Sequence, residues 1–361
     1  MTSTLFTPIA LRGVEIPNRI AVSPMCQYMS EDGSANDWHL MHLGQFAMGA
    51  AGLLMTEATH VSRIGRISHR CLGLYSDDNE TQLKRVIDFC RRHGVAKLGI
   101  QLAHSGRKGS AHTPAEGGKP LGPEESPWLT VAPSALPFGP GWHVPEALSR
   151  QGLKDVREQF VDSARRSARI GFDVAELHAG HGYLLHEFLS PISNRRDDEY
   201  GGTTANRIRF PLEVFEAVRA AWPKDRALGV RVSATDWLDG GWTPEETVLF
   251  ARELRALECD FVDVTSGALD PRQQIPFAPG YNVQFAEKVR KEAGIVTMSV
   301  GMISRAGQAE DIVASGKADM VAIARAMLDD PRWAWRAARE LDAQAPYAKN
   351  YMRCHPSAWK P

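Results

Sequence analysis

The feature that most constrains the fold is a series of short apolar runs, rich in β-branched residues, that recurs along the whole chain. The runs are almost continuously apolar rather than alternating, which is typical of strands buried on both faces of a parallel sheet. The predicted strands are Ile20–Pro24, Gly52–Thr59, Lys97–Leu102, Asp173–His178, Leu228–Ser233, Phe261–Thr265, Thr297–Gly301 and Met320–Ala324. Eight parallel strands are the number that closes a barrel.

Segments with helical periodicity lie between these runs. Residues 76–93 place apolar side chains on one stripe, and Gly94 follows as a stop signal. Thr243–Glu246 reads as a capping box, Ser304 as an N-cap and Gly294 as a helix end. Strands and helices that alternate eight times predict an α/β fold, a single (β/α)8 TIM barrel over residues 1–361. The alternative, a doubly wound open sheet, normally carries a G-x-G-x-x-G turn, which the sequence lacks.

The connection after the third predicted strand, residues 104–150, is unusually long. It holds eight of the 22 prolines, so a regular long helix cannot occupy it. Because it follows a strand, it emerges at the carboxyl end of the barrel, where active sites of this fold lie. We expect a loop insertion that acts as a wall or lid, and a disordered insert is the alternative.

Composition narrows the function classes. Lys and Arg number 42 and Asp and Glu 43, so the formal net charge of -1 indicates neither a nucleic-acid nor a membrane partner. The five cysteines are scattered and form no C-x-x-C pair, which favours a reducing compartment over a disulfide framework. No signal peptide and no bilayer-spanning apolar run is visible, so we expect a cytoplasmic protein.

Residues at the carboxyl ends of the predicted strands are the candidates for the site. The seventh strand ends at Gly301 and the eighth at Ala324–Arg325, where this fold often binds a phosphate through backbone N–H groups and an arginine. Arg231 lies in an otherwise apolar strand. A buried arginine needs an anionic ligand or an internal salt bridge, here with Asp236 or Asp263.

The sharpest local signal is a pair of histidines, His178 and His181, after the fourth predicted strand. The pair could ligate a metal together with Glu176, His186 or Glu187. It could instead donate hydrogen bonds to a carbonyl oxygen on which negative charge develops. Two structural histidines are the third interpretation. The sequence has no phosphate-binding P-loop and no G-x-S-x-G elbow, which counts against nucleotide hydrolysis and α/β-hydrolase chemistry.

Short motifs accompany the strand ends along the chain. They are Asn18-Arg19-Ile20, Ser23-Pro24-Met25-Cys26-Gln27-Tyr28, Gln101-Leu102-x-His104-x-Gly106-Arg107-Lys108, His178-x-x-His181-Gly182-Tyr183-Leu184, Arg196-x-Asp198-x-Tyr200-Gly201-Gly202, Asn206-Arg207 and Arg231-Val232-Ser233. With these motifs the chain resembles the Old Yellow Enzyme family of FMN-dependent ene-reductases, particularly its thermophilic-like subclass and the xenobiotic reductases. The resemblance runs from Leu5 to the last helix.

The resemblance implies that FMN lies across the barrel mouth and is reduced by NADPH or NADH, with NADPH the expected donor. It places the FMN phosphate at Gly301, Ala324 and Arg325, and it places Arg231 at the N1–C2 carbonyl edge, where the reduced flavin carries negative charge. The other residues that it implies around the flavin are Ser23, Pro24, Met25, Ala58, Cys26 near the N5–O4 edge and Gln101 at the pyrimidine edge.

The resemblance also implies a substrate class, activated alkenes such as enones and enals, with maleimides and nitro compounds as further candidates. His178 and His181 would bind the substrate carbonyl oxygen, and hydride would pass from flavin N5 to the β-carbon. Tyr183 would protonate the α-carbon, and Tyr28 would contact the substrate.

At two positions the chain departs from the family pattern. Ala324 stands where the family commonly has glycine, and Met302 stands where some relatives have tryptophan. The tail, residues 342–361, is similar to that of the subclass, in which an arginine reaches a neighbouring subunit's site. We therefore expect Arg353 to do so in a homodimer or homotetramer, and a frayed terminus is the alternative.

Two other functions stay open. A zinc-dependent barrel hydrolase could use His178 and His181, but it lacks clear further ligands and leaves Gln101, Arg231 and Arg325 without a role. A non-catalytic flavin-binding protein would have no use for the histidines beside the flavin. The resemblance itself implies no metal.

Overall fold

The computed structural model describes residues 3–359 and contains a closed barrel of eight parallel strands. The strands are β3 (Ile20–Val22), β4 (Leu53–His60), β5 (Lys97–Ala103), β8 (Val174–Ala179), β9 (Ala227–Ser233), β10 (Phe261–Thr265), β11 (Val296–Ser299) and β12 (Met320–Ile323). The eight predicted strands and the TIM barrel are confirmed, and each strand end lies within two residues of its predicted position. The outermost residues of the predicted 1–361 domain, 1–2 and 360–361, lie outside the described part.

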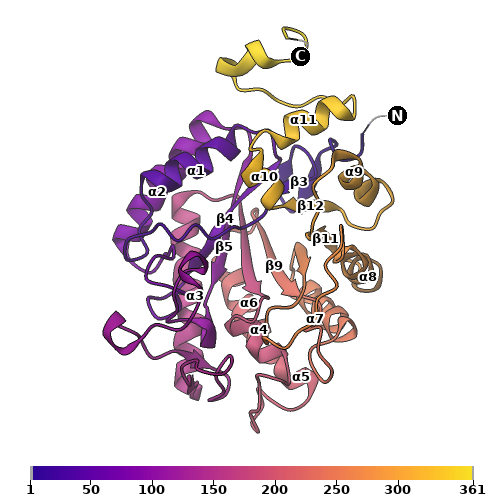
Figure 1. Ribbon diagram of the computed structural model, residues 1–361. Coiled ribbons are helices and arrows are strands. Elements are labelled where there is room, and N and C mark those ends of the chain that lie inside the picture. The colour runs from indigo at the N-terminus through magenta and orange to yellow at the C-terminus, as the bar shows by residue number, and fades with distance from the viewer. Residues whose placement is uncertain (1–2, 360–361) are drawn as a thin grey trace.

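Helices surround the barrel (Figure 1). They are α1 (Asp37–Ala47), α2 (Asp77–His93), α3 (Arg150–Ile170), α4 (Leu184–Leu189), α5 (Thr204–Arg207), α6 (Arg209–Ala221), α7 (Pro244–Ala256), α8 (Val283–Ala293), α9 (Ala306–Ala314), α10 (Arg325–Asp329) and α11 (Trp333–Glu340). Among the described residues, no helix is both long enough and apolar enough to cross a membrane.

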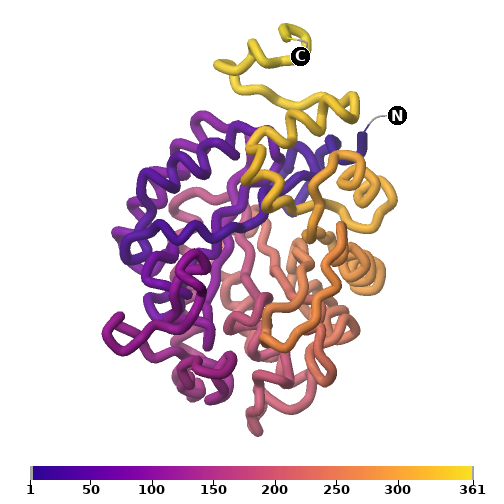
Figure 2. Tube along the Cα trace, in the orientation of Figure 1, coloured from indigo at the N-terminus to yellow at the C-terminus, as the bar shows by residue number. Residues whose placement is uncertain are grey.

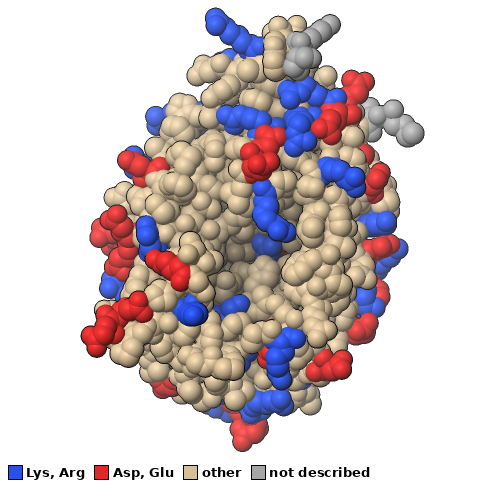
Figure 3. Space-filling model, viewed as in Figure 1, with Lys and Arg blue, Asp and Glu red and all other residues tan. Residues whose placement is uncertain are grey.

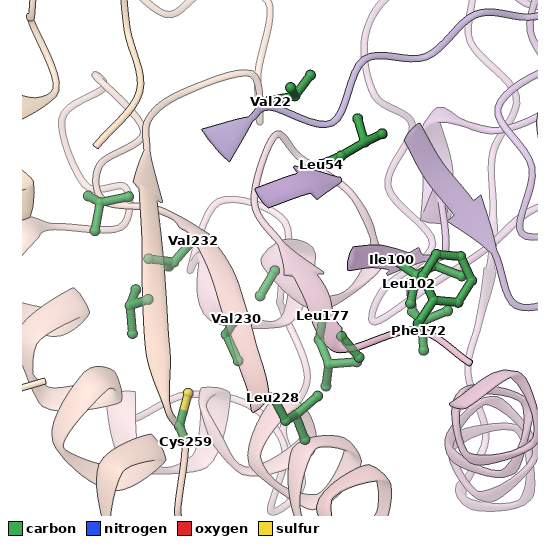
Figure 4. Packing of buried hydrophobic residues seen from close by; sticks show 14 of the residues in the cluster. Val22, Leu54, Ile100, Leu102, Phe172, Leu177, Leu228, Val230, Val232 and Cys259 are labelled. Atoms are coloured by element: carbon green, nitrogen blue, oxygen red, sulfur yellow. The ribbon is translucent and has the colours of Figure 1, made fainter. Parts of the chain in front are cut away.

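Strand side chains alternate between two cores, as the pleat requires. Outward-facing residues such as Val22, Leu54 and Leu177 pack in the larger cluster that the helices complete (Figure 4). Inward-facing residues near the strand starts form a smaller apolar cluster, which also includes the hairpin of β1 (Ile9–Leu11) and β2 (Val14–Ile16). The hairpin therefore closes the amino end of the barrel, and the site must open at the carboxyl end.

The predicted helix ends are mostly confirmed. The Ser76 side chain caps α2, and Thr243 forms a capping box at the start of α7. Gly294 ends α8 with a left-handed φ of 65°. The expectation for Ser304 is wrong: α9 starts at Ala306, and Ser304 instead donates its backbone N–H to the side chain of Gln308.

Gly94 follows α2 as predicted, but for a different physical reason. Its φ is -95°, so the chain needs no left-handed residue here. A Cβ at this position would lie 2.7 Å from Cβ of Ala47 and 2.6 Å from the carbonyl oxygen of Cys90. Glycine is therefore needed for close packing of α2 against the end of α1.

The 104–150 insertion has a defined path, so the disordered alternative is wrong. It consists of the short 3-10 turns η1 (Gly106–Lys108), η2 (Pro114–Glu116) and η3 (Pro123–Glu125) and the strand pair β6 (Val131–Ala132) and β7 (Glu146–Ala147). Arg107 binds it to the barrel mouth by donating to the carbonyl oxygens of Leu136, Pro137 and Leu269. The insertion thus stands beside the carboxyl ends of the strands.

Candidate active site

The carboxyl ends of the strands open into a cavity of about 620 Å³, a size typical of small-molecule sites. Figure 3 shows the hollow, with Lys or Arg side chains at its floor and rim. Five predicted site residues line it: His181, Arg231, Gly301, Ala324 and Arg325. The structure thus brings together five residues that were predicted from strand ends far apart in the sequence.

The end of the cavity that was predicted to bind phosphate depends on glycine. Gly301 has φ 129°, a conformation that side-chain-bearing residues rarely adopt. A Cβ there would lie 2.9 Å from Nδ2 of Asn282 and 3.0 Å from the ring of Tyr281. Arg325, at the start of α10, is exposed at this end of the cavity. A flexible guanidinium beside a bare backbone suits a phosphate.

Strand register builds a polar layer at the bottom of the site. A register shift between Met55 and Ala58 in β4 pairs Ala58 with Gln101, and Gln101 in turn pairs with Glu176 on β8. Gln101 Nε2 donates to Glu176 Oε1 at 2.8 Å. Because this bond engages the amide nitrogen, the amide oxygen of Gln101 is left to accept from a ligand N–H.

Arg231 lies beside this pair on β9. Its Nη1 donates to Ser23 Oγ at 3.2 Å, and its Nε lies 3.2 Å from Asp263 Oδ2. Of the two carboxylates considered for a salt bridge, Asp263 is therefore the partner, whereas Asp236 lies 3.0 Å from Nε2 of His186. The Nε–Asp263 contact lacks hydrogen-bond geometry, and among the described residues Arg231 Nε has no hydrogen-bond partner.

The two histidines contact one another. The backbone N–H of Gly180 donates to His178 Nδ1, so the neutral His178 carries its proton on Nε2. His178 Nε2 lies 3.2 Å from His181 Nδ1, and His181 Nε2 lies 3.0 Å from Thr265 Oγ1. Burial lowers the pKa of both imidazoles well below the usual value, and Arg231 lowers them further. Both rings are thus neutral hydrogen-bonding groups at neutral pH.

The metal-ligand interpretation has no geometric support. Within residues 3–359, no group of three His, Cys, Asp or Glu side chains is arranged to hold a metal ion. The residues considered as further ligands are engaged elsewhere. Glu176 binds Gln101, His186 contacts Asp236, and Glu187 accepts from the backbone N–H of Arg107.

Tyr183 lies against the histidine pair. It precedes α4, and its ring meets the His178 ring edge to face, with centroids 5.1 Å apart. Burial raises the pKa of Tyr183, and the nearby Cys26 raises it further. Burial, Cys26 and Tyr183 likewise raise the pKa of Tyr28. Cys26, Tyr28 and Tyr183 therefore lie within electrostatic range of one another, and all three keep their protons at neutral pH.

Two residues at the site were missed as candidates. Thr265 ends the sixth predicted strand, so the strand-end argument applies to it as well. Lys108 ends one of the family motifs, but the sequence assigns it no role in the site. Its Nζ donates to the carbonyl oxygens of His181 and Ala268 at 2.9 and 2.8 Å, and burial lowers its pKa to about 8. Those two residues have left-handed φ values of 54° and 70°, so Lys108 holds two strained turns together.

The remaining predicted residues do not all join the site. Pro24 and Met25 directly follow β3 and are half-buried. Arg353 lies in the 3-10 turn η4 (Lys349–Cys354) and is exposed on the tail, which projects from the barrel (Figure 2). Stacking of Trp335 on Tyr347, with centroids 4.2 Å apart, attaches the tail to α11. Residues 360–361 of the predicted tail lie outside the described part, and the role of Arg353 stays a prediction.

The chain matches the family model described as "NADH:flavin oxidoreductase / NADH oxidase family" over residues 4–344. It belongs to this family, the Old Yellow Enzyme family. An NADPH dehydrogenase of Geobacillus sp. (strain WCH70) is 42% identical over 355 residues, which cover 98% of this chain and 99% of that protein.

Solved structures agree. Morphinone reductase matches with a TM-score of 0.79 at 27% identity, over 96% of this chain and 91% of that one. Its complex with tetrahydroNAD matches with a TM-score of 0.78 at 26% identity, over 95% of this chain and 92% of that one. The protein is thus an enzyme, an FMN-dependent oxidoreductase with NAD(P)H as the reductant.

The residues present fit FMN. Two buried nitrogen donors of the cavity lining, Arg231 Nε and Asn282 Nδ2, have no hydrogen-bond partner among the described residues. One of them lies at the polar layer and the other beside Gly301. A flavin with a polar heterocycle at one end and a phosphate at the other matches this pair of ends.

Proposed function

We propose that this enzyme is an ene-reductase that reduces α,β-unsaturated carbonyl compounds, with NADPH as the preferred donor. The observation that carries the proposal is the neutral His178–His181 pair beside Tyr183 at the mouth of a flavin barrel. When bound, FMN supplies hydride from N5 to the β-carbon of the alkene. The protein has to bind the cofactor, hold the carbonyl oxygen and deliver a proton.

The cofactor would be held at two ends. Gly301, Ala324 and Arg325 would hold the phosphate, and Arg231 and Gln101 the pyrimidine edge. The guanidinium of Arg231 stabilises negative charge at that edge, which favours the reduced cofactor. The other residues proposed to line the flavin are Ser23, Pro24, Met25, Cys26 and Ala58.

The histidines would hold the carbonyl oxygen. His178 already has a proton on Nε2, which points toward His181 Nδ1. A carbonyl oxygen that accepts from both rings requires His181 to move its proton from Nε2 to Nδ1. Nε2 must then accept a hydrogen bond, and the Thr265 hydroxyl can rotate to donate it. Thr265 thus lets the pair provide two donors to a developing oxyanion without a metal.

Tyr183 would supply the proton for the α-carbon. Its raised pKa means that the phenol retains its proton at neutral pH. The Lys108 ammonium lies 5.2 Å from the centre of its ring, where it can stabilise the negative charge left after transfer. Tyr28 would contact the substrate near Tyr183.

Enones and enals fit this arrangement because their carbonyl oxygen withdraws charge from the alkene. Maleimides share that feature, and a nitro group offers similar oxygens. A solved relative carries the name morphinone reductase, which agrees with a ketone substrate class. We further propose that Arg353 of a neighbouring subunit completes the site in a homodimer or homotetramer.

The test is an anaerobic titration of the purified holoenzyme followed by visible absorption. NADPH should bleach the flavin bands, and cyclohexenone should restore them. Bleaching without recovery would keep the flavin and exclude the proposed substrate class. A protein that FMN cannot colour would overturn the cofactor assignment.

A further inference from the structure

Below the site, three charged side chains meet inside the barrel. Glu176, Arg231 and Asp263 are 0%, 5% and 1% exposed. Beneath them lies the apolar cluster that includes Val174 and Phe261, from the same strands as Glu176 and Asp263. Solvent therefore cannot reach this ionic layer from the amino end of the barrel.

The layer contains one carboxyl group more than it has cations. Among the described residues, Glu176 Oε2 and Asp263 Oδ1 are buried without a hydrogen-bond partner. If both carboxyls were ionised, Arg231 would balance only one of them. An unbalanced buried charge is costly, and binding one proton removes it. Burial, followed by the Asp263 charge, raises the pKa of Glu176, and burial raises that of Asp263.

Within the described part of the chain, no further charged side chain that faces the layer balances this extra charge. Gln101 of β5, which contacts Glu176, is uncharged. His178 of β8 is neutral at pH 7, and burial keeps the Cys259 thiol, just before β10, protonated. On β4, Glu57 Oε1 lies 3.4 Å from His39 Nε2, and Glu57 Oε2 accepts a hydrogen bond from the backbone N–H of Gln27. The net charge of the layer therefore depends on whether Glu176 and Asp263 are protonated.

Each carboxyl contacts one side chain that is proposed to bind the flavin. Glu176 binds Gln101, and Asp263 contacts Arg231. Gln101 and Arg231 are the two residues that we assign to the pyrimidine edge. Negative charge added at that edge competes with the two carboxylates for the positive charge of Arg231. The proton affinity of both carboxyls therefore rises.

We propose that Glu176, together with Asp263, is a positioning residue that takes up a proton when the bound FMN is reduced and thereby sets the pH dependence of the flavin potential. This inference rests on the proposed placement of FMN. A hydride from NADPH brings two electrons and one proton, which leaves the reduced flavin with one negative charge. At a pH where the oxidised enzyme keeps both carboxyls ionised, the second proton comes from solvent and goes to the carboxyl pair, whose one remaining negative charge Arg231 balances.

The proposal predicts a pH window in which the midpoint potential of bound FMN changes twice as steeply as outside it. Inside the window two protons accompany two electrons, and outside it only one does. Spectroelectrochemical titration of the FMN-loaded enzyme measures this slope. Glu176→Gln should remove the window while FMN stays bound. Asp263→Asn should do the same, because the remaining Glu176 then pairs with Arg231.

Glu187→Gln is the matched control. Glu187 is another fully buried carboxyl with a raised pKa, but it accepts from the backbone N–H of Arg107 and contacts neither Gln101 nor Arg231. This variant should keep the wild-type window. A loss of the window in Glu187→Gln would mean that any buried carboxyl has the effect, and it would overturn the assignment.

A second measurement uses the wild-type enzyme alone. Reduction by NADPH in weakly buffered solution with a pH indicator should consume about one proton per flavin within the window. The absence of both uptake and window would overturn the inference even if FMN binds normally. If the wild-type chain binds no FMN, the proposed function itself fails. The two failures are therefore distinguishable.

Discussion

At the scale of single residues, the site depends on which ring nitrogen carries a proton. Gly180, His178, His181 and Thr265 form a chain of hydrogen bonds in which each partner determines the next. Burial keeps both imidazoles neutral, so they can exchange donor and acceptor roles without a net charge change. The threonine hydroxyl can either donate or accept, so it can follow such an exchange.

Replacing Thr265 by valine should therefore weaken binding of a carbonyl ligand. Without the hydroxyl, His181 Nε2 has no donor when Nδ1 is protonated, and we expect Kd to rise about tenfold. Titration with benzaldehyde, followed by flavin absorption, measures this Kd. Thr265→Ser keeps the hydroxyl and should resemble wild type. Equal weakening in both variants would show that the methyl group matters instead.

Replacing Tyr183 by phenylalanine should separate the two half-reactions. The phenol contributes a proton only to the alkene, and loss of a general acid typically costs about 10²–10⁴ in rate. Stopped-flow kinetics should show slow reoxidation by cyclohexenone and nearly unchanged reduction by NADPH. Equal slowing of both half-reactions would contradict the role of Tyr183 as proton donor.

At the scale of elements, the site depends on how strands end. β11 ends just before Gly301, whose left-handed backbone leaves room beside Asn282 and Tyr281. His178 and Arg231 lie at the carboxyl ends of β8 and β9, and His181, Lys108 and Arg325 lie in the segments that follow β8, β5 and β12. A strand end is therefore the unit that carries function in this fold.

Replacing Gly301 by alanine should weaken FMN binding and destabilise the protein. An L-residue at φ 129° costs about 1–3 kcal/mol, and its Cβ would lie 2.9 Å from Asn282 Nδ2. Fluorescence titration of the apoprotein with FMN gives the affinity. Gly307→Ala is the control, because no atom lies within 4 Å of its Cβ position in α9. Similar effects at both positions would contradict the argument.

The stability of the fold at acid pH depends in part on a buried histidine at the end of a strand. Burial lowers the pKa of His60 at the end of β4 to about 4, although His60 Nδ1 lies 3.0 Å from the carbonyl oxygen of Leu72. The unfolded chain binds this proton near pH 6.5, so the stabilisation is complete above that pH and is lost as the pH falls towards 4. Urea unfolding across this range should show a smaller pH dependence in His60→Asn. An unchanged dependence would exclude His60 as its source.

At the scale of the whole molecule, the tail is the part that projects from the barrel (Figure 2). It carries exposed Arg353 and packs on α11 through Tyr347 and Trp335. Such a segment is free to reach a second copy of the chain.

Arg353→Ala should raise KM for the alkene if the arginine enters a neighbouring site, while kcat for flavin reduction changes little. Sedimentation should show a dimer or tetramer for the wild-type chain. Lys349→Ala, in the same 3-10 turn, serves as the control. A fully active monomer with unchanged KM in Arg353→Ala would contradict the prediction.

The barrel and the location of its site follow from local sequence patterns. Each strand is a local apolar run, and the candidate site residues within it or just after it, such as Arg231 and Gly301, can be recognised without knowing the neighbouring strands. Helix caps such as Thr243 are equally local.

Which side chains meet across the site depends on the folded chain and cannot be read from the sequence. The contacts of Gln101 with Glu176 and of Arg231 with Asp263 depend on the register between strands, which closure of the barrel sets. The bond of Thr265 to His181 joins residues 84 positions apart. Such pairs leave no local pattern, because their partners are adjacent only across strands and loops. The charge balance beneath the flavin site is therefore a property of the folded barrel and not of any one segment.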